Sequence, residues 1–147
     1  MICHYQELTP LRVGEHHADN PRPPRRSEDA GSRLSGGETL GTALAVAETV
    51  VELLPGDLYG WIQRSFALHE LKRTAEAREK LKPAAKKFPK QHLVFYNLAC
   101  YACQLGERKE ALKLLGKAID LAGKNDIRLK ALEDPDLEPL WKDIGEI

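Results

Sequence analysis

The chain has 147 residues, of which 42% are hydrophobic and 30% charged, and its 22 basic and 22 acidic side chains sum to a net charge of zero. This length suits one small domain with some extra chain, and the apolar fraction is sufficient for a packed core. Neutrality argues against a histone-like nucleic-acid binder or an acidic disordered tail as a description of the whole chain.

The three cysteines, Cys3, Cys100 and Cys103, form no framework typical of disulfide-rich secreted proteins. Residues 1–30 contain no apolar run of the kind that a signal peptide needs, and no segment approaches the roughly 18 apolar residues of a membrane span. We therefore expect a cytoplasmic protein that does not contact a membrane.

Residues 1–38 differ in composition from the rest of the chain. They hold four of the nine prolines, and the first lysine of the chain is Lys72. Proline lacks a backbone donor and restricts the residue before it, so the proline-rich run 20–27 does not suit a helix or a sheet. We predict a disordered tail containing proline and arginine over 1–38, and a helical domain over 39–147.

From Leu40 onward, apolar residues recur at spacings of three and four, which is the period of an amphipathic helix. Helices are predicted at 40–54, 58–71, 75–88, 93–105, 109–121 and, less clearly, 127–144. Asp57, Thr74 and Asp126 lie at the starts of three of these segments, where a side-chain oxygen accepts from the first amides of a helix. The pattern predicts an all-α chain of short antiparallel helix pairs.

The sequence also repeats with a period of 34 residues. The aligned pairs are Trp61 and Phe95, Ala67 and Tyr101, Ala77 and Ala111, Leu81 and Leu115, and Ala84 and Ala118. Carried backward, the shift aligns Ala43 with Ala77, Val50 with Ala84 and Pro55 with Pro89, so half a repeat precedes the first full one.

The repeated residues predict how the helices of each pair contact one another. Alanines seven residues apart lie on one face of the second helix, where their small size lets the first helix approach closely. The large residues predicted to fill the core between pairs are Trp61, Leu81, Phe95, Leu98, Leu115 and Leu121.

Paired helices with a period of 34 residues resemble the tetratricopeptide repeat family, over about residues 40–125. The copy at 93–112 fits the family pattern best, with Asn97, Leu98 and Ala99 followed by Gly106 and Ala111. The resemblance implies a short right-handed α-solenoid of about two and a half repeats. Its units are a half-repeat at 40–55, repeats at 57–89 and 91–123, and a C-terminal cap at 126–147.

The first copy departs from the second in three places. Arg64 stands where the second copy has Leu98. Lys72 replaces the glycine of the turn, and Pro83 falls inside the second helix. Since an interior proline removes a backbone hydrogen bond at a cost of about 3 kcal/mol, we predict a kink or break near 79–83.

Residues 131–141 resemble the closing segment of many bacterial tetratricopeptide proteins. Asp136 is predicted to cap a last short helix, in which Pro139 sits where no donor is needed. An apolar stripe is then predicted to cover the last repeat, formed by Leu137, Leu140, Trp141 and Ile144.

By the family resemblance, the first helix of each pair lines a concave groove that holds a peptide or a helix of another protein. The residues at these positions are Tyr59, Ile62, Phe66, His69, Glu70, Leu93, Tyr96, Asn97, Cys100, Cys103 and Gln104. Asn97 matches part of the clamp by which some relatives hold chaperone tails. The basic residues of that clamp are absent here, so chaperone binding is not inferred.

No motif indicates catalysis, a cofactor or a metal centre. Cys100 and Cys103 form a Cys-x-x-Cys pair, but zinc needs about four ligands and His69 is the further candidate that can be named. Redox pairs of this kind open a helix, whereas these cysteines lie deep within one. We predict semi-buried thiols that pack between helices, no metal, no cofactor and no enzymatic activity.

The sequence thus predicts a non-catalytic module that binds another protein. A structural homodimer is one alternative, since two and a half repeats are fewer than the roughly three that independent stability needs. Nucleic-acid binding through 72–92, with eight basic and two acidic residues, is less favoured because the aromatic residues are predicted to lie away from its lysines.

The zero net charge is a sum of opposed blocks. Residues 1–71 carry six basic and ten acidic side chains, a net −4, and residues 72–132 carry fifteen and six, a net +9. Residues 133–147 carry one and six, a net −5. We expect the acidic C-terminal end to fold back onto the basic repeats, or to compete with an acidic ligand for them.

Overall fold

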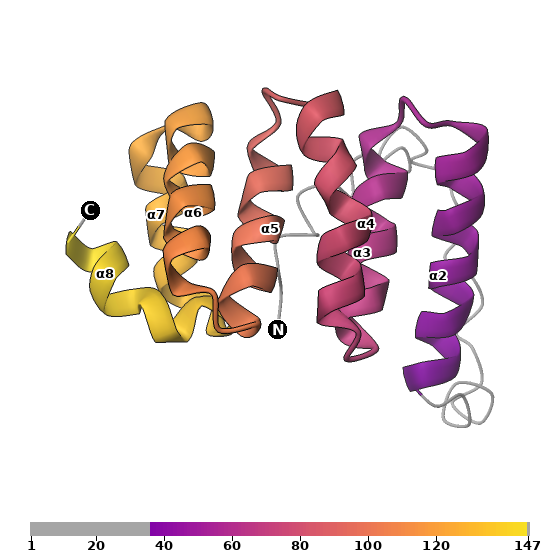
Figure 1. The fold of residues 1–147 in the computed structure, drawn as a ribbon, viewed down its shortest axis with the longest axis horizontal. Helices are drawn as coiled ribbons and strands as arrows, with labels where there is room; N and C mark the ends of the chain where they lie inside the picture. Colours follow the sequence, from indigo (N-terminus) through magenta and orange to yellow (C-terminus); the bar gives the residue numbers. More distant parts are fainter. Residues whose placement is uncertain (1–35, 147) are drawn as a thin grey trace, which may run out of the picture.

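The structure is a computed structural model that describes residues 36–146, so nearly all of the predicted tail lies outside the described residues. Helix α2 (Gly36–Leu53) begins three residues before the predicted start of the domain. The other elements are α3 (Leu58–Glu70), α4 (Thr74–Lys87), α5 (His92–Gln104), α6 (Arg108–Ala122), α7 (Lys124–Glu133), the 3-10 helix η3 (Pro135–Leu140) and α8 (Trp141–Glu146). Within residues 36–146 there is no strand, and the helices lie in one row from α2 to α8 (Figure 1).

The helix boundaries repeat with the same 34-residue period as the sequence. Helix α5 begins 34 residues after α3 begins, and it ends 34 residues after α3 ends. The same separation lies between the starts of α4 and α6 and between the ends of α2 and α4. The turns within the two pairs also match. The amide of Arg73 donates to the carbonyl of Leu68 at 2.9 Å, and the amide of Glu107 donates to the carbonyl of Ala102 at 2.9 Å. The repeat is therefore a property of the backbone as well as of the sequence.

Each of these turns has one residue in the left-handed conformation. Gly106 has a φ of 82°, and Lys72 at the aligned position has a φ of 65°. Glycine adopts this conformation without a steric penalty, whereas a residue with a Cβ is strained by roughly 1–2 kcal/mol. The first turn therefore keeps its geometry despite the lysine.

The core follows the row of helices. The repeated residues of the second helices are fully buried: Ala77, Leu81, Ala84, Ala111, Leu115 and Ala118. Phe95 and Leu98 are also buried, and Trp61 packs against the core while staying half-buried. Leu121 is 38% exposed, so its predicted place in the core is wrong. It lies in the last turn of α6, just before the chain leaves the helix at Gly123.

Helix α4 continues through Pro83, so of the predicted kink or break the break is wrong. Because Pro83 has no N–H, the carbonyl of Glu79 lacks the usual helical donor four residues later. In the same turn, the guanidinium of Arg64 on α3 donates to the carbonyl of Lys80 at 2.8 Å. Arg64 and Pro83 both differ from the second copy of the repeat, and they lie at the same turn of α4. Pro83 removes a backbone donor from this turn, and the Arg64 side chain provides one.

Of the three predicted N-caps, one is confirmed. Asp57 caps α3, and its side chain accepts from the amide of Tyr59 at 2.9 Å. Thr74 is instead the first residue of α4, with its hydroxyl 2.9 Å from Nδ1 of His69. Asp126 lies inside the first turn of α7, because that helix starts earlier than predicted.

The predicted last helix, 127–144, is divided into α7, η3 and α8. Asp134, with a ψ of 114°, is extended rather than helical. Proline disfavours the helical conformation in the residue before it, so Pro135 accounts for the end of α7.

Candidate functional site

Much of the groove predicted from the family resemblance is buried. The buried members are Ile62, His69, Leu93, Tyr96, Asn97, Cys100 and Cys103. Tyr59, Phe66 and Glu70 are half-buried, and Gln104 is exposed. Four of these residues contact the segment 134–144, which we name the C-terminal clasp.

Asp134 connects the clasp to α5. It is 3% exposed and accepts from the hydroxyl of Tyr96 at 2.8 Å, with the thiol of Cys100 at 3.8 Å from the same oxygen. Its other carboxylate oxygen accepts from the amide of Asp136 at 3.0 Å. The sequence predicted Asp136 as the cap of the C-terminal segment. In the structure the cap is Asp134, so that prediction is wrong.

Asp136 connects the clasp to the first repeat. Its carboxylate lies 3.2 Å from Nε2 of His69, at the end of α3. The amide of Gln104 on α5 donates to the backbone carbonyl of Asp136 at 2.8 Å. Because His69 also contacts Thr74 through Nδ1, both of its ring nitrogens are engaged and neither is free to bind a metal ion.

The apolar side of the clasp is part of the core. Leu137, Leu140 and Ile144 are fully buried, so the predicted stripe is confirmed at these positions. Trp141 is half-buried, and its indole N–H donates to the carbonyl of Ala131 at 3.0 Å. The clasp therefore closes the C-terminal end of the row with side chains of the same chain.

The acidic end folds back, but its buried aspartates contact α3 and α5 rather than the basic surface of α4. Within the clasp, Asp143 pairs with a basic side chain, that of Arg108 at the start of α6. This differs from the expectation of a general charge attraction, because Asp134 and Asp136 are held by neutral donors and by His69.

The Cys-x-x-Cys pair is buried, and its surroundings disfavour the thiolate form of Cys103. Cys100 and Cys103 are buried thiols. Burial raises the pKa of the Cys103 thiol, and the nearby charges of Asp136 and Asp134 raise it further. A protonated thiol is a poor nucleophile and a poor metal ligand. Within residues 36–146, no group of three or more His, Cys, Asp and Glu side chains is placed to hold a metal ion.

An open apolar groove lies at the opposite end of the row, between α2 and α3. It has a volume of about 220 Å³ and is lined by Ala43, Val46, Ala47, Val50, Tyr59, Gly60 and Gln63. Val46 is 58% exposed. Of the predicted groove residues, Tyr59 alone lines this groove.

Two details of α3 shape the groove. A Cβ at Gly60 would lie 2.8 Å from Cγ1 of Val50, so the glycine lets α2 approach α3 closely at this point. Nε2 of Gln63 is buried and has no hydrogen-bond acceptor in the described part of the chain. The groove thus combines an apolar wall with one unsatisfied donor.

The groove residues on α2 were not among the residues predicted for the site. Ala43 and Val50 align with Ala77 and Ala84, which are buried in the next repeat where α3 packs against α4. At α2, no described helix occupies the place that α3 takes in the next repeat. The backward alignment contained this signal, because a half-repeat without its first helix leaves one face uncovered.

A second cavity, of about 390 Å³, is lined by residues of α4, α5 and α6 and of the turn before α6: Arg78, Lys82, Leu98, Glu107, Glu110 and Leu114. Arg78 lies 2.6 Å from Glu107, and this hydrogen bond lowers the pKa of the Glu107 carboxyl. Since two basic and two acidic side chains line it, this cavity has no strong preference for a ligand of either charge.

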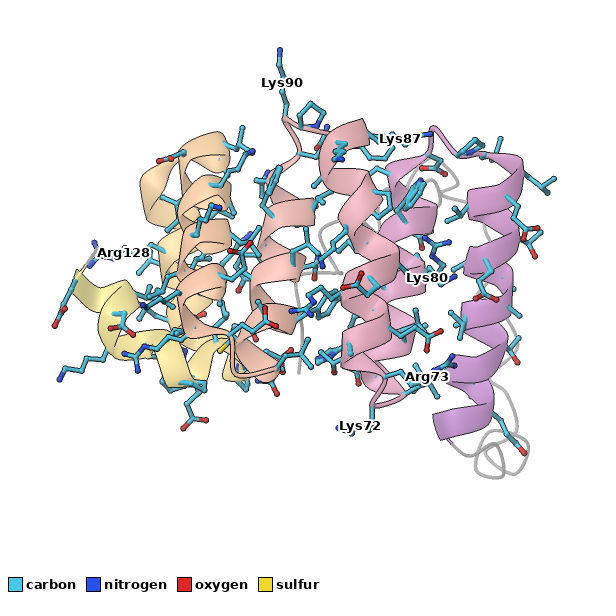
Figure 2. All side chains as sticks on the ribbon, viewed as in Figure 1. Lys72, Arg73, Lys80, Lys87, Lys90 and Arg128 are labelled. Carbon is cyan, nitrogen blue, oxygen red and sulfur yellow. The ribbon has the colours of Figure 1, made fainter. Side chains whose placement is uncertain are left out.

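The basic segment 72–92 covers α4 and its flanking turns, and Figure 2 shows where its side chains lie. The labelled members are Lys72, Arg73, Lys80, Lys87 and Lys90. Lys87 Nζ is 5.9 Å from the ring centre of Trp61. The prediction that the aromatic residues lie away from the lysines of this segment is therefore wrong at Lys87, because a long lysine side chain reaches over the ring.

None of the described helices combines the length and the apolar composition needed to cross a lipid bilayer. No protein-family model matches the chain, and no curated protein matches it. The function is therefore argued from the geometry of the groove and of the clasp.

Proposed function

We propose that this protein is a non-catalytic interaction module of the tetratricopeptide type, and that its groove between α2 and α3 receives an α-helix of another polypeptide chain. One observation carries this proposal. In the full repeat, α3 packs beside α4. The groove lies at the corresponding place beside α2, one repeat earlier. The 34-residue period of the helix boundaries and the shared left-handed turn residue support the repeat type.

The lining favours a helix over an extended peptide. Four lining residues on α2 are aliphatic, and the polar atoms of the lining come from Tyr59 and Gln63 on α3. An extended peptide would bring unpaired backbone donors and acceptors against this wall, whereas a helix satisfies most of its own. The α2 residues from Ala43 to Val50 span about 10 Å, which matches two turns of a bound helix.

The clasp supports the same choice of site. Tyr96, Cys100 and His69 contact residues 134–144, so the α5 side of the predicted groove is occupied from within the chain. The α2 end has no such cover among the described residues. The buried thiols of Cys100 and Cys103 fit a reducing compartment, and we propose that the protein acts in the cytoplasm.

Capture of partners from a cell extract tests the site when three proteins are compared. These are the wild type, Val46→Asp in the groove, and Leu129→Asp on α7 as a matched control, since Leu129 is 61% exposed. We expect the wild type and Leu129→Asp to retain the same partner chain. Val46→Asp should retain at least about tenfold less, because burying a charge against an apolar helix is costly. Equal retention by all three proteins would contradict the proposal.

A second candidate function, nucleic-acid binding, is favoured by one observation. Lys87 and Arg64 both lie near the ring of half-buried Trp61, so cations and an aromatic ring share one surface. Such a surface binds single strands through phosphates and stacked bases. A steep salt dependence of binding to an RNA pool, reduced in Lys87→Glu, would support it. Failure to bind heparin at low salt would dismiss it.

A further inference from the structure

We infer that the helix received by the α2–α3 groove is α2 of a second copy of this protein, with the two α2 helices antiparallel about a two-fold axis. This inference rests on the proposed function, since it names the partner of the same groove. It is argued from the spacing of the exposed residues on α2, from their register and from the charges around them.

Helix α2 has an apolar seam that extends beyond the groove. Ala43, Val46, Val50 and Leu53 follow one another at spacings of three, four and three residues. This is the spacing by which one helix packs along another in a coiled coil. Val46 is 58% exposed and Leu53 is 73% exposed. A single long helix thus presents a pairing surface that the described part of the chain leaves largely uncovered.

The seam is complementary to itself. Two identical helices related by a two-fold axis across their length are antiparallel, as the two helices within each pair of this protein are. With the axis between Val46 and Ala47, Val46 of each copy faces Ala47 of the other copy across the interface. Ala43 then faces Val50, so that each larger side chain meets a smaller one.

The end of the seam closes in the same register. Leu53 of one copy faces Leu40 of the other, and this contact covers the most exposed leucine of α2. A helix of 18 residues is about 27 Å long, so the paired region extends well beyond the groove itself. The α3 residues that line the groove add a second contact on each side of the axis.

The charges on α2 permit this pairing. The helix has three acidic residues, Glu38, Glu48 and Glu52, and no lysine or arginine. Glu48 follows the seam residue Val46 by two positions, and Glu52 follows Val50 by two, which is about 200° around the helix. These glutamates therefore lie on the side of α2 away from the seam, and the pairing buries neither carboxylate.

The preceding segment of the chain has the wrong sequence to fill the groove. The 34-residue shift aligns residues 24–36 with α3. Ile62 and Ala67, which α3 buries, then align with Glu28 and Arg33. A second α2 provides apolar residues at the required spacing, whereas this segment provides charges.

Pairing of this kind also limits the size of the assembly. An isologous contact uses the same surface on both copies and is complete at two. Each clasp then lies at an outer end of one continuous row of helices, because α2 and the clasp are at opposite ends of the chain's row (Figure 1). The assembly is a closed dimer.

Sedimentation velocity between about 1 and 100 µM tests the dimer, with Val46→Asp and Leu129→Asp as the matched pair. We expect the wild type and Leu129→Asp to form dimers over this range. The dissociation constant of Val46→Asp should rise at least about tenfold, with unchanged helix content and melting temperature at low concentration. A wild type that stays monomeric throughout overturns the inference, as does a dimer that Val46→Asp leaves unchanged.

Mixed cysteine cross-linking tests the register in a Cys3→Ser background. Ala43→Cys and Val50→Cys should each give little disulfide dimer alone and form a mixed disulfide when combined, since facing Cα atoms about 4.4–6.8 Å apart are bridged readily. Homodimers of either variant alone, without the mixed species, would show parallel pairing and overturn the inference.

These outcomes separate the two proposals. A monomeric wild type whose capture of a different protein is lost in Val46→Asp overturns the second copy and leaves the proposed function standing. If Val46→Asp changes neither the self-association of the protein nor its capture of a partner, both proposals are overturned.

Discussion

The C-terminal end of the helical row is closed by its own chain, whereas the N-terminal end leaves apolar side chains exposed. Leu137, Leu140 and Ile144 of the clasp are fully buried, while Val46 and Leu53 of α2 are 58% and 73% exposed. Both ends belong to the same 34-residue repeat, which would continue at each end if further helices were present.

The difference shows how one repeat produces two kinds of surface. At the C-terminal end, Asp134 and Asp136 bind side chains of α5 and α3 that would otherwise line a groove. At the N-terminal end, the first helix of the half-repeat is missing from the described chain, and an apolar wall stays open. Because the clasp covers the C-terminal end, the uncovered N-terminal end is the proposed binding site for a partner.

The largest expected effect comes from removing an apolar anchor at the closed end. Leu140→Ala should lower the free energy of unfolding by about 2–5 kcal/mol, because it leaves a cavity in a fully buried site. The matched change at the open end, Leu53→Ala, should alter it by less than about 0.5 kcal/mol in dilute monomer. Urea unfolding measures both. Similar losses for the two variants would remove the contrast between the ends.

Removing the polar anchor of the clasp should have the next largest effect. Asp134→Ala leaves the hydroxyl of Tyr96 and the amide of Asp136 buried without their acceptor, and it should lower the unfolding free energy by about 2 kcal/mol. Asp57→Ala, which removes the exposed cap of α3, should cost about 1 kcal/mol. A smaller loss for Asp134→Ala than for Asp57→Ala would show that the clasp does not depend on this carboxylate.

The two turns permit a comparison inside the repeat. Lys72→Gly should raise the unfolding free energy by about 1 kcal/mol, because it removes left-handed strain at φ 65°. Gly106→Ala should lower it by about 1 kcal/mol through the same strain, since a Cβ there meets no atom within 4 Å. Thermal unfolding tests both, and effects of the same sign would contradict the matching of the turns.

The smallest effect on the structure is expected in an experiment that compares thiol alkylation at the two ends of the row. Because burial and nearby carboxylates raise the pKa of Cys103, its thiolate fraction at pH 8 is reduced, and alkylation should be slow until the protein unfolds. In Val46→Cys, the introduced thiol should react at the rate of an exposed cysteine. Peptide mass spectrometry follows each site separately. Equally fast alkylation of Cys103 would show that the clasp opens readily.

Local pattern was sufficient to predict the helices and their repeat. The apolar spacing placed the first five described helices within a few residues, and the 34-residue shift appears in the helix boundaries. Asp57 was a correct cap because the capping residue lies directly beside the helix that it caps.

Contacts between residues far apart in sequence were not predictable in the same way. The pairing of His69 with Asp136 joins residues 67 positions apart, and that of Tyr96 with Asp134 joins residues 38 positions apart. Helical periodicity contains no record of such contacts, so the α5 side of the groove was expected to be open. The uncovered face of α2 was implied by the half-repeat, but exposure and cavity shape were needed to recognise it.

Hydrogen–deuterium exchange at two protein concentrations tests most directly whether the α2 end is the site that receives a second helix. Between about 1 and 100 µM, the amides of α2 and of the first turns of α3 should become more protected, while those of α7, η3 and α8 stay unchanged. Exchange in α2 that is independent of concentration, or a change confined to the clasp, would contradict this assignment.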